Sequence, residues 1–420
     1  MQKNTIPLRR EVDEKNRWDL SKLYKNDEAW YEALAGYEKQ IDKVAAFKGT
    51  LGDSAQALAA FLDCEHEIKL LEEQLGRYAE LRQCEDEGDD AARAMTGRFI
   101  ILAARSAAEA SWGPSEIQAI ADDKMARFLE ADCLACYRVY LHKLLRWKPH
   151  ILSENEERLI ALHSEAGGIV GEAFSVLTNV DFDFGQIDTP EGRLPLTQST
   201  FSVFLEYKDR GLRERAWRQF YGEFSAHKTT LAALYAGQVK QDVIHARIRG
   251  FGSAREAALF GDDVPLSTYD NLIATITENL APLHRYYDLR RRALKLKALG
   301  PWDMHTALVP CAEKTTSWEE AAALVIEALA PLGGEYGSVL EAGLAGRWAD
   351  RYENKGKRSG AFSAGGFTAD PYILMNYKSD SIRDIFTLAH EAGHSMHSWY
   401  SARSNPFPHY SYTIFEAEVA

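Results

Sequence analysis

Apolar residues recur three and four positions apart through most of the chain. From residue 19 to about residue 168, Leu, Ala and aromatic residues follow this spacing among Glu, Lys and Arg, which is typical of amphipathic helices. Ser317 with Glu320 and Ser267 with Asp270 each place a hydroxyl three residues before an acid, as in the capping box that starts many helices. The pattern predicts a large protein that is mainly helical.

The segment from residue 179 to residue 196 breaks this helical pattern. Apolar residues alternate with acids in it, and the run Thr-Pro-Glu-Gly at positions 189–192 supplies a turn, as in a β-hairpin. We place a boundary near this hairpin. It divides the chain into an amino-terminal helical lobe, residues 1–190, and a second lobe, residues 191–420.

Residues 357–377 form a second interruption. Small residues and the pair Gly365 and Gly366 precede the apolar run from Tyr372 to Met375, which indicates a strand or a hairpin. The predicted fold class is therefore mainly α, with a small β component toward the carboxyl end.

Composition narrows the classes of function. The chain has 420 residues, 46% of them hydrophobic and 26% charged, so it can bury one or two full cores without a disulfide or a structural metal. Its formal net charge is −13. Nucleic acids and anionic membranes require positive potential over the contact surface, so the acidic balance argues against both and favours cationic peptides.

The cysteines and the hydropathy indicate a compartment. Five cysteines are thinly spread, unlike the dense and even framework of a small secreted protein. No uncharged apolar run approaches the roughly 18 residues of a membrane span, and the first residues lack the apolar core of a signal peptide. We therefore expect a soluble, cytoplasmic protein that does not contact a membrane.

The segment 381–400 carries the strongest chemical signal, and its apolar positions follow helical spacing. His390 and His394 are four residues apart, about one turn and roughly 6 Å of rise along one face, which lets both imidazoles reach one ion. Glu391 stands between them and completes H-E-x-x-H. In this pattern the two histidines bind zinc and the glutamate acts as general base.

A catalytic zinc ion needs a third protein ligand and an open position. His397 lies seven residues from His390, roughly 10.5 Å of rise, which is too far for both to bind one ion, so we expect it to support the site or to pack in the core. Glu416 and Glu418 follow after a loop with two prolines. At about 100° per residue these two point roughly 200° apart, so only one can face the metal. Spacing alone leaves both open.

Longer stretches of the chain carry a family resemblance. The run TLAHEAGHSMHSWYS, with Glu418 placed 24 residues after His394, resembles the zinc site of the oligoendopeptidase F group of the thimet-oligopeptidase-like M3 metallopeptidases. Three further stretches are similar to this family: RWDLSKLY, ARIRGFGSAREAALFGDDVP and KRSGAFSAGGFTADPYILMNY. The resemblance thus spans nearly the whole chain.

The resemblance implies a set of site residues. His390, His394 and Glu418 correspond to the ligands of one Zn²⁺ ion per chain, and Glu391 corresponds to the catalytic base. Glu416 becomes the second choice for the third ligand. The second lobe, residues 191–420, is then the catalytic metallopeptidase lobe.

The resemblance also implies a zinc-dependent endopeptidase that hydrolyses short oligopeptides. Its expected architecture is two helical lobes around a substrate channel, with a small β-sheet next to the zinc helix. Gly365, Gly366 and His397 are the predicted substrate contacts. Bare backbone at the glycines would permit the close approach of a peptide that adds as a strand.

The family pattern breaks at the end of the chain, because family members continue well beyond this point. Their further segment contains the His and Tyr residues thought to stabilise the oxyanion. We therefore expect the chain to be a fragment with a companion carboxy-terminal fragment as partner. An alternative function is a zinc- or peptide-binding helical scaffold without turnover, and a chance motif in a helical interaction protein would predict no zinc.

Overall fold

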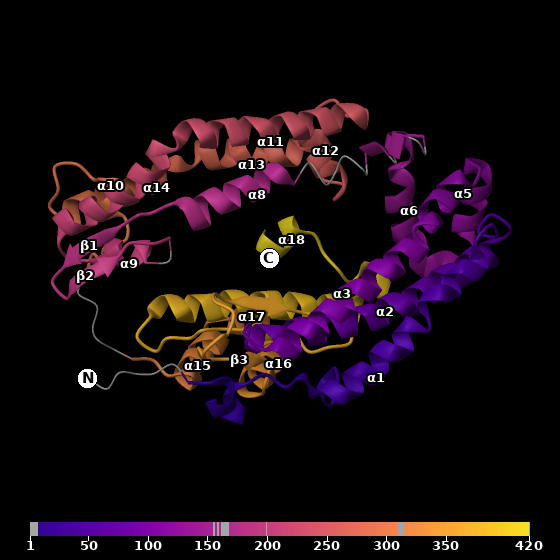
Figure 1. Cartoon of the computed structure of the whole chain (residues 1–420), viewed down its shortest axis with the longest axis horizontal. Coiled ribbons are helices and arrows are strands. Elements are labelled where there is room, and N and C mark those ends of the chain that lie inside the picture. The colour runs from indigo at the N-terminus through magenta and orange to yellow at the C-terminus, as the bar shows by residue number, and fades with distance from the viewer. Residues whose placement is uncertain are drawn as a thin grey trace. The chain divides into compact units, whose positions relative to one another are not determined.

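The computed structural model describes residues 7–153, 156–157, 159–160, 168–198, 200–309 and 315–419, which form two compact units. Unit 1 combines the two ends of the chain, Met1–Arg146 and Glu313–Ala420, and unit 2 is the middle segment, Trp147–Ala312. The indigo start and the yellow end of the chain in Figure 1 accordingly belong to one unit. Unit 1 therefore depends on residues from both ends of the sequence.

Helices make up most of the described chain. Unit 1 contains α1 (Asp27–Glu38), α2 (Ala55–Glu85), α3 (Asp90–Ala110), α4 (Trp112–Ala119), α5 (Asp122–Glu130), α6 (Arg138–Arg146), α15 (Trp318–Ala328), α16 (Gly334–Ala345), α17 (Ile382–Ser404) and α18 (Ile414–Val419). Unit 2 contains α8 (Ile169–Val176), α9 (Phe201–Glu206), α10 (Arg210–Ala226), α11 (Lys228–Ile248), α12 (Ala254–Phe260), α13 (Leu266–Glu278) and α14 (Leu280–Ala293).

Short 3-10 helices and one π-helical turn connect many of these elements. The 3-10 turns are η1 (Arg9–Glu11), η2 (Glu14–Asn16), η3 (Leu20–Lys22), η4 (Ile41–Phe47), η5 (Asp132–Tyr137), η6 (Lys148–His150), η8 (Pro301–Asp303), η9 (Ala330–Leu332) and η10 (Phe407–His409), and η7 (Leu177–Asp181) is a π-helical turn. This content confirms the prediction of a mainly α protein.

Polar residues start several of the helices. The N-cap side chains of α1, α2 and α15 each accept a hydrogen bond from the backbone N–H three residues on, which satisfies a donor that the helix itself leaves free. The capping box predicted for Ser317 and Glu320 is confirmed. The one predicted for Ser267 and Asp270 is wrong, because α13 already begins at Leu266.

A three-stranded sheet in unit 1 contains the predicted β segment at 357–377. The strands β3 (Ala349–Asp350), β5 (Tyr372–Leu374) and β4 (Phe362–Ala364) are hydrogen-bonded in that order. β3 is parallel to β5 and β4 is antiparallel to it. β4 is therefore an edge strand of this sheet.

The central strand β5 lies between the two hydrophobic cores of unit 1. Successive side chains of a strand point to opposite faces. Tyr372 and Leu374 belong to the core built by the helices from α1 to α6, whereas Ile373 and the following Met375 belong to the core built by α15, α16 and α17. Because both faces of the strand are buried, the sequence of this segment is a continuous apolar run. The sheet thereby places α17 against β4 and β5.

A buried cluster of charges joins the first residues of the chain to this sheet. Asp350 of β3 pairs with Lys357 at 2.7 Å and with Arg9 at 2.6 Å, and the side chains of Asp350 and Lys357 have no exposure to solvent. The Lys357 ammonium also donates to the carbonyl oxygens of Tyr352 and Met375, each at 2.6 Å. Buried charges are tolerated when they are paired and hydrogen-bonded, so the cluster fixes the loop that follows β3.

Unit 2 contains the predicted hairpin. β1 (Gln186–Thr189) pairs antiparallel with β2 (Gly192–Pro195), which confirms the turn at 189–192. The start of the predicted hairpin segment belongs instead to the π-helical turn η7. A small core of aromatic and aliphatic residues joins the hairpin to α9 and α10 through Phe184, Ile187, Leu196, Phe204, Leu212, Ala216 and Phe220.

A buried carboxylate in unit 2 is held by two arginines of α10. The side chain of Asp303 in η8 has no solvent exposure, and it pairs with Arg213 at 2.9 Å and with Arg210 at 3.0 Å. Its Oδ2 also accepts the backbone N–H of Gly300 at 2.8 Å. These contacts attach the loop after α14 to α10.

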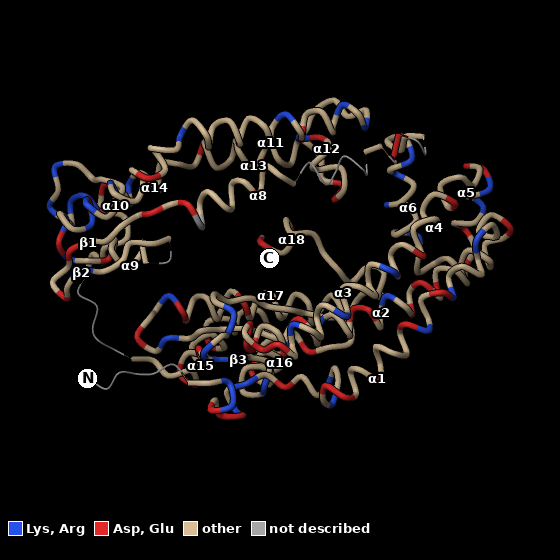
Figure 2. Tube along the Cα trace, viewed as in Figure 1, with Lys and Arg blue, Asp and Glu red and all other residues tan. Residues whose placement is uncertain are grey.

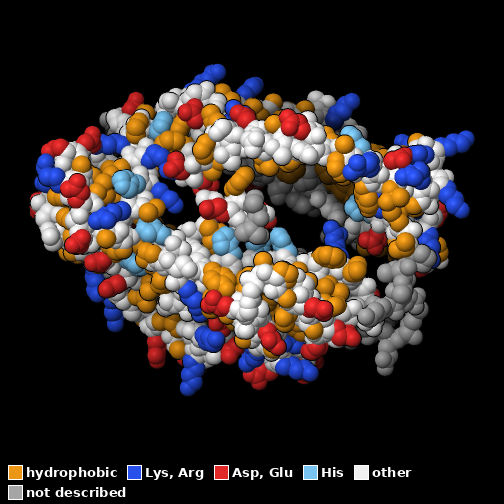
Figure 3. All heavy atoms as spheres, turned by 180° about the vertical axis from the view of Figure 1, so that it is seen from behind, with side chains coloured by type: hydrophobic (Ala, Val, Ile, Leu, Met, Phe, Trp, Pro, Cys, Tyr) orange, Lys and Arg blue, Asp and Glu red, His pale blue; other side chains and the backbone are white. Residues whose placement is uncertain are grey.

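Charges of both signs are interspersed over the surface. Positions of Lys and Arg and positions of Asp and Glu both occur among the helices of each unit (Figure 2). Hydrophobic and charged side chains are likewise mixed over the face that Figure 3 shows.

No helix in the described part of the chain has the length and the apolar character needed to cross a membrane. Cys64, Cys84, Cys133 and Cys136 are free thiols. The cytoplasmic location stays a prediction.

The predicted lobes, residues 1–190 and 191–420, do not coincide with the two compact units. A single cut along the sequence cannot represent unit 1, because one of its cores combines amino-terminal helices with residues of the carboxy-terminal strands β4 and β5. A functional division near residue 190 and a substrate channel stay predictions.

Candidate active site

Helix α17 carries the H-E-x-x-H residues. Its buried residues Leu388, Ala392 and Met396 recur four apart and pack in a hydrophobic core together with β5. Residues four apart share a helix face, so His390 and His394 lie together on another side of α17. His390 is exposed and His394 is half-buried. The helix predicted for this segment is confirmed.

Three polar side chains converge beside α17. The Nε2 atoms of His390 and His394 are 3.0 Å apart, and Oε1 of Glu418 lies 3.9 Å from Nε2 of His394. One ligand atom from each of the three residues lies within 4.8 Å of the other two. Glu418 belongs to α18, which follows α17 after residues 405–413. The structure thus brings together the three residues that the family resemblance implies.

The donor atoms of this cluster can be compared with the requirements of a zinc ion. Two ligand atoms bound to zinc at about 2.1 Å, with a tetrahedral angle between them, lie roughly 3.4 Å apart. The observed separations of 3.0 Å between the histidine nitrogens and 3.9 Å between His394 and Glu418 bracket this value. Two imidazoles and one carboxylate are ligands that zinc accepts, and they leave a fourth position open. The residues present therefore fit a catalytic zinc ion.

Glu391 lies next to the cluster and is buried, with 7% of its surface exposed. Burial raises the pKa of the Glu391 carboxyl, the nearby His390 lowers it and Glu418 raises it, and the net direction is upward. The Glu391 carboxylate is thus shielded from water beside the cluster of His390, His394 and Glu418. Proton transfer by a side chain depends on geometry first and on pKa second, so Glu391 is a candidate for such a role.

The surroundings of His394 favour the neutral form of its imidazole. Burial lowers the pKa of His394 and His390 lowers it further, while Glu418 acts in the opposite direction, and the net shift is downward. A histidine binds a metal through a deprotonated ring nitrogen. The environment of His394 therefore favours the protonation state that a ligand needs.

His397 lies beside the cluster of His390, His394 and Glu418 and is not a member of it. Its ring stacks on Tyr412, with centroids 3.7 Å apart and planes inclined by 7°. Its Nδ1 is buried and has no hydrogen-bond partner among the described residues. The packing agrees with the expectation that His397 supports the site instead of binding zinc together with His390. Its contact with substrate stays a prediction.

The carboxylate of Glu416 has different partners from the carboxylate of Glu418. Its carboxylate accepts hydrogen bonds from the backbone N–H and the hydroxyl of Thr413, at 3.0 Å and 3.1 Å. These bonds form at the start of α18, where backbone donors lack partners within the helix. Of the two acids that spacing left open, the geometry places Glu418 at the histidines and Glu416 at the helix start.

Gly365 and Gly366 follow the edge strand β4 and both lie in tight packing. A Cβ atom at position 365 would lie 2.3 Å from Cβ of Ser398 in α17, and one at position 366 would lie 3.2 Å from a carboxylate oxygen of Glu73 in α2. The absence of a side chain at residue 365 thus lets the chain after β4 approach α17. The predicted contact of these glycines with substrate stays a prediction.

Sequence reasoning missed the aromatic segment between α17 and α18. Tyr412 exchanges a hydrogen bond of 2.7 Å with the hydroxyl of Ser398, and the hydroxyl of Tyr410 donates to Glu73 in α2. Ser363 of β4 and Ser395 of α17 are likewise joined by a hydroxyl contact of 2.8 Å. The density of rings in the run Phe-Pro-His-Tyr-Ser-Tyr at 407–412 was the available signal.

Comparison with known proteins decides the family. A sequence model described as peptidase family M3 matches residues 203–420, and a model described as oligopeptidase F matches residues 116–184. The chain belongs to peptidase family M3. The M3 match contains α17, α18 and the cluster of possible metal ligands. The resemblance to the oligoendopeptidase F group is confirmed.

Curated relatives of this M3 chain match it over nearly its whole length. Oligopeptidase PepF of Bacillus subtilis (strain 168) is 38% identical, over 99% of this chain and 62% of PepF. An oligoendopeptidase F homolog of Borreliella burgdorferi is 36% identical, over 98% of this chain and 69% of the homolog. The chain therefore spans less than two thirds of the length of PepF.

Solved structures also resemble the M3 chain. A Chlamydophila abortus protein described as a peptidase superposes with a TM-score of 0.87 at 31% identity, over 99% of this chain and 70% of that one. Oligoendopeptidase-F from Enterococcus faecium superposes with a TM-score of 0.61 at 26% identity, over 90% of this chain and 64% of that one. The mainly helical fold with small sheets is thus the fold of M3 peptidases.

Proposed function

We propose that the chain is the zinc-binding part of an endopeptidase that hydrolyses short oligopeptides. The supporting observation is the approach of His390, His394 and Glu418 to within 4.8 Å, beside the buried Glu391, in a chain of family M3. These three residues would hold one Zn²⁺ ion per chain. Zinc in such a site supplies a Lewis acid that polarises the scissile carbonyl and lowers the pKa of water to about 7.

Glu391 is the proposed general base and general acid. It takes the proton of the attacking water and delivers it to the amine that leaves when the peptide bond breaks. Its place in the sequence directly after His390 keeps its carboxylate beside the ligands, and its burial restricts its motion. No covalent bond between the chain and the peptide is needed.

The substrate is proposed to add to β4 as a further strand. β4 is the edge strand in the order β3-β5-β4, and Ser363 in it contacts Ser395 of the zinc helix at 2.8 Å. A peptide bound through main-chain hydrogen bonds is recognised with little dependence on its side chains. Gly365, Gly366 and His397 are the proposed contacts on this side.

The test is the variant Glu391→Gln, assayed with a quenched oligopeptide while bound zinc is counted. We expect one zinc per chain and a loss of turnover, because glutamine retains the shape of the side chain and cannot accept the proton. Glu416→Gln is the matched control, since its amide oxygen can still accept the bonds from Thr413. Turnover retained in Glu391→Gln would refute the assignment. Efficient digestion of casein would contradict the restriction to oligopeptides.

A second function is a zinc- or peptide-binding scaffold that needs a companion chain for turnover. The observation that favours it is the length of the relatives, since the chain spans 62% of PepF. Zinc binding without turnover in the unmodified chain would support the scaffold, and turnover by the chain alone would exclude it. The absence of zinc binding would refute the endopeptidase and the zinc-binding form of the scaffold.

A further inference from the structure

The position of Glu418 does not follow from the packing of its own helix. α18 has six residues, and its large apolar side chains Ile414 and Phe415 are 71% and 37% exposed. A helix this short is not stable by itself, and apolar burial stabilises most helices in proteins. The carboxylate of Glu418 lies 3.9 Å from Nε2 of His394. The segment 405–413, which we call the tyrosine loop, connects α17 to α18 and makes the specific contacts described next.

The first anchor of the tyrosine loop is on α17. The ring of Tyr412 stacks on His397 with centroids 3.7 Å apart, and its hydroxyl lies 2.7 Å from the hydroxyl of Ser398. His397 and Ser398 lie about one helical turn beyond His394. The loop is thus fastened to the helix that carries the two histidines, six residues before Glu418.

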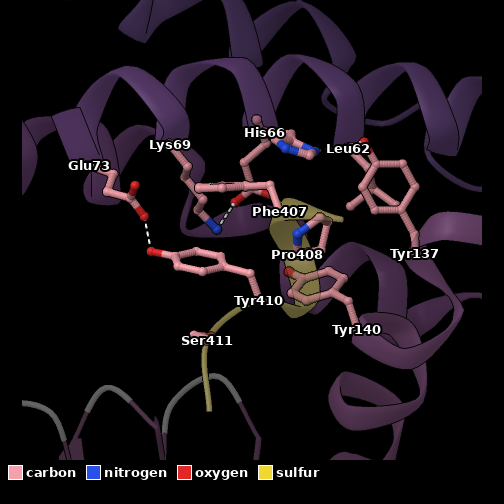
Figure 4. Close-up of a pocket in the computed structure, with 11 residues that line it drawn as sticks. Leu62, His66, Lys69, Glu73, Tyr137, Tyr140, Phe407, Pro408, Tyr410 and Ser411 are labelled. Atoms are coloured by element: carbon pink, nitrogen blue, oxygen red, sulfur yellow. Dashed lines mark hydrogen bonds and ion pairs between the residues drawn. The ribbon is translucent and has the colours of Figure 1, made fainter. Parts of the chain in front are cut away.

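The second anchor is on α2. The hydroxyl of Tyr410 donates to Glu73, as Figure 4 shows, and the same carboxylate accepts the backbone N–H of Phe367 at 2.7 Å. Burial and the hydrogen bond to Glu73 raise the pKa of Tyr410, so its hydroxyl remains a donor. The carbonyl oxygen of Tyr410 accepts a hydrogen bond from Ser401 of α17. Tyr410 therefore joins the loop to two helices.

Stacked rings support the start of the loop. Phe407 stacks on His66 of α2 with ring centroids 4.6 Å apart. The ring centroid of Phe407 also lies 5.6 Å from that of Tyr410. Beneath these rings lies a cavity of about 300 Å³ between α2, η5, α6 and the loop (Figure 4). A loop that lines a cavity on one side depends on its specific anchors more than one that is packed on all sides.

We propose that Tyr410 and Tyr412 are positioning residues that hold the carboxylate of Glu418 at the two histidines. This inference rests on the proposed function, because it takes Glu418 as a zinc ligand. Partners outside the ligand set that orient a metal ligand typically contribute 10–100-fold to metal affinity. Here Tyr412 acts through six residues of backbone and Tyr410 through eight, rather than through a direct contact with Glu418.

The experiment measures the Zn²⁺ affinity of the full chain by competition with a chromogenic chelator. Tyr410→Phe and Tyr412→Phe each remove one hydroxyl, and we expect each to weaken zinc binding about 10-fold. Tyr412→Ala also removes the stack on His397 and should weaken binding further, toward 100-fold. Partial recovery in Tyr412→Phe relative to Tyr412→Ala is the expected signature of the stacked ring.

Tyr37→Phe is the matched control. Tyr37 is buried in α1, and its hydroxyl donates to Glu72, the neighbour of Glu73 on α2, at 3.0 Å. The substitution removes an equivalent tyrosine–glutamate bond without touching the tyrosine loop. We expect unchanged zinc affinity. A loss equal to that of Tyr410→Phe would overturn the proposal, because it would show a general effect of destabilising unit 1.

A double-mutant cycle with Glu418→Gln separates this inference from the proposed function. If the tyrosines act through Glu418, then Tyr410→Phe should cause little further loss once residue 418 no longer supplies a carboxylate. Full additivity would overturn the positioning role. Unchanged affinity in Tyr410→Phe and Tyr412→Phe, with a clear loss in Glu418→Gln, would overturn the inference and leave the proposed function standing. Unchanged affinity in Glu418→Gln would refute the proposed ligand set itself.

The coordination of Co²⁺ gives an independent readout. Cobalt placed in a tetrahedral site has stronger visible absorption than cobalt with more water ligands. We expect Tyr412→Ala and Glu418→Gln to shift the spectrum in the same direction, because both would replace the carboxylate by water. A spectrum of Tyr412→Ala identical to that of the unmodified chain would contradict the proposal.

Discussion

Substitution of Gly365 by alanine tests the packing of the edge strand against the zinc helix. A Cβ atom at this position would lie 2.3 Å from Cβ and 2.4 Å from Oγ of Ser398. Carbon atoms prefer separations of about 3.5–4.0 Å. Ser398 is 8% exposed and belongs to the middle part of α17, so it cannot swing away as the end of a long side chain could. The chain after β4 or the helix must shift by about 1 Å.

The expected loss of stability follows from two opposing effects. Overpacking of a tight contact costs about 1–3 kcal/mol, and the upper part of this range applies because the obstacle is a Cβ atom on a helix. Replacing glycine by alanine also reduces the freedom of the unfolded chain, which offsets about 0.4–1 kcal/mol. We expect Gly365→Ala to lower the free energy of unfolding by about 2 kcal/mol.

The assay is urea unfolding followed by circular dichroism, with Gly97→Ala as control. Gly97 lies in the interior of α3, and a Cβ there meets no atom within 4 Å, so alanine should stabilise by about 0.5–1 kcal/mol. Ser398→Gly removes the obstructing atoms, and the pair Gly365→Ala with Ser398→Gly should be more stable than the sum of the single changes predicts.

Two results would refute this reasoning. Stability of Gly365→Ala within about 0.5 kcal/mol of the unmodified chain would show that the contact relaxes without cost. If Gly365→Ala lowers the free energy of unfolding equally with and without Ser398→Gly, the loss of stability does not arise from the contact with Ser398. Unchanged stability together with a raised KM for peptides would assign Gly365 to substrate contact rather than to packing.

Three further predictions concern buried charge, acid stability and metal. Lys357→Met should lower the free energy of unfolding by about 3–5 kcal/mol, because the buried Asp350 loses a partner at 2.7 Å; a urea midpoint near that of the unmodified chain would contradict this. Burial raises the pKa of Asp303, but hydrogen bonds from Arg210, Gly300 and Arg213 outweigh it and hold that pKa below its ordinary value. Its contribution to stability is then present above the unfolded pKa of about 3.9 and is lost as the pH falls through the folded pKa, so Asp303→Asn should flatten the acid dependence of the urea midpoint; an unchanged slope would argue against this. Zn²⁺ at about 100 times its Kd should raise the free energy of unfolding by about 2.7 kcal/mol, reversibly with a chelator and less in Glu418→Gln at the same zinc concentration; no shift in the thermal midpoint would speak against a metal site.

Local patterns were sufficient for much of the secondary structure. The period of three to four predicted the helices, and the capping box at Ser317 and the turn at 189–192 are where the pattern places them. These features depend on residues within a few positions of each other. The prediction failed at Ser267, because a hydroxyl and an acid at capping distance do not decide which residue begins a helix. Neighbouring helix ends and tertiary contacts make that choice.

The candidate site was predictable in part for the same reason. His390, Glu391 and His394 are within one turn of helix, so their common position follows from helical geometry alone. The choice between Glu416 and Glu418 required either the family resemblance or the structure. Both acids are near the same loop, and only the hydrogen bonds from Thr413 to Glu416 and the approach of Glu418 to His394 distinguish them.

The sequence by itself determined the helical character of the chain, the histidine pair with its glutamate, and the membership of the metallopeptidase family. Each of these is a short-range pattern or a string of residues that can be compared directly. Only the tertiary structure decided that both ends of the chain share one unit, that β5 is buried between two cores, and that Tyr410 and Tyr412 anchor the loop before Glu418. These features join residues that are distant in sequence, such as Tyr410 and Glu73, and contacts of that kind depend on how whole elements pack rather than on any local period.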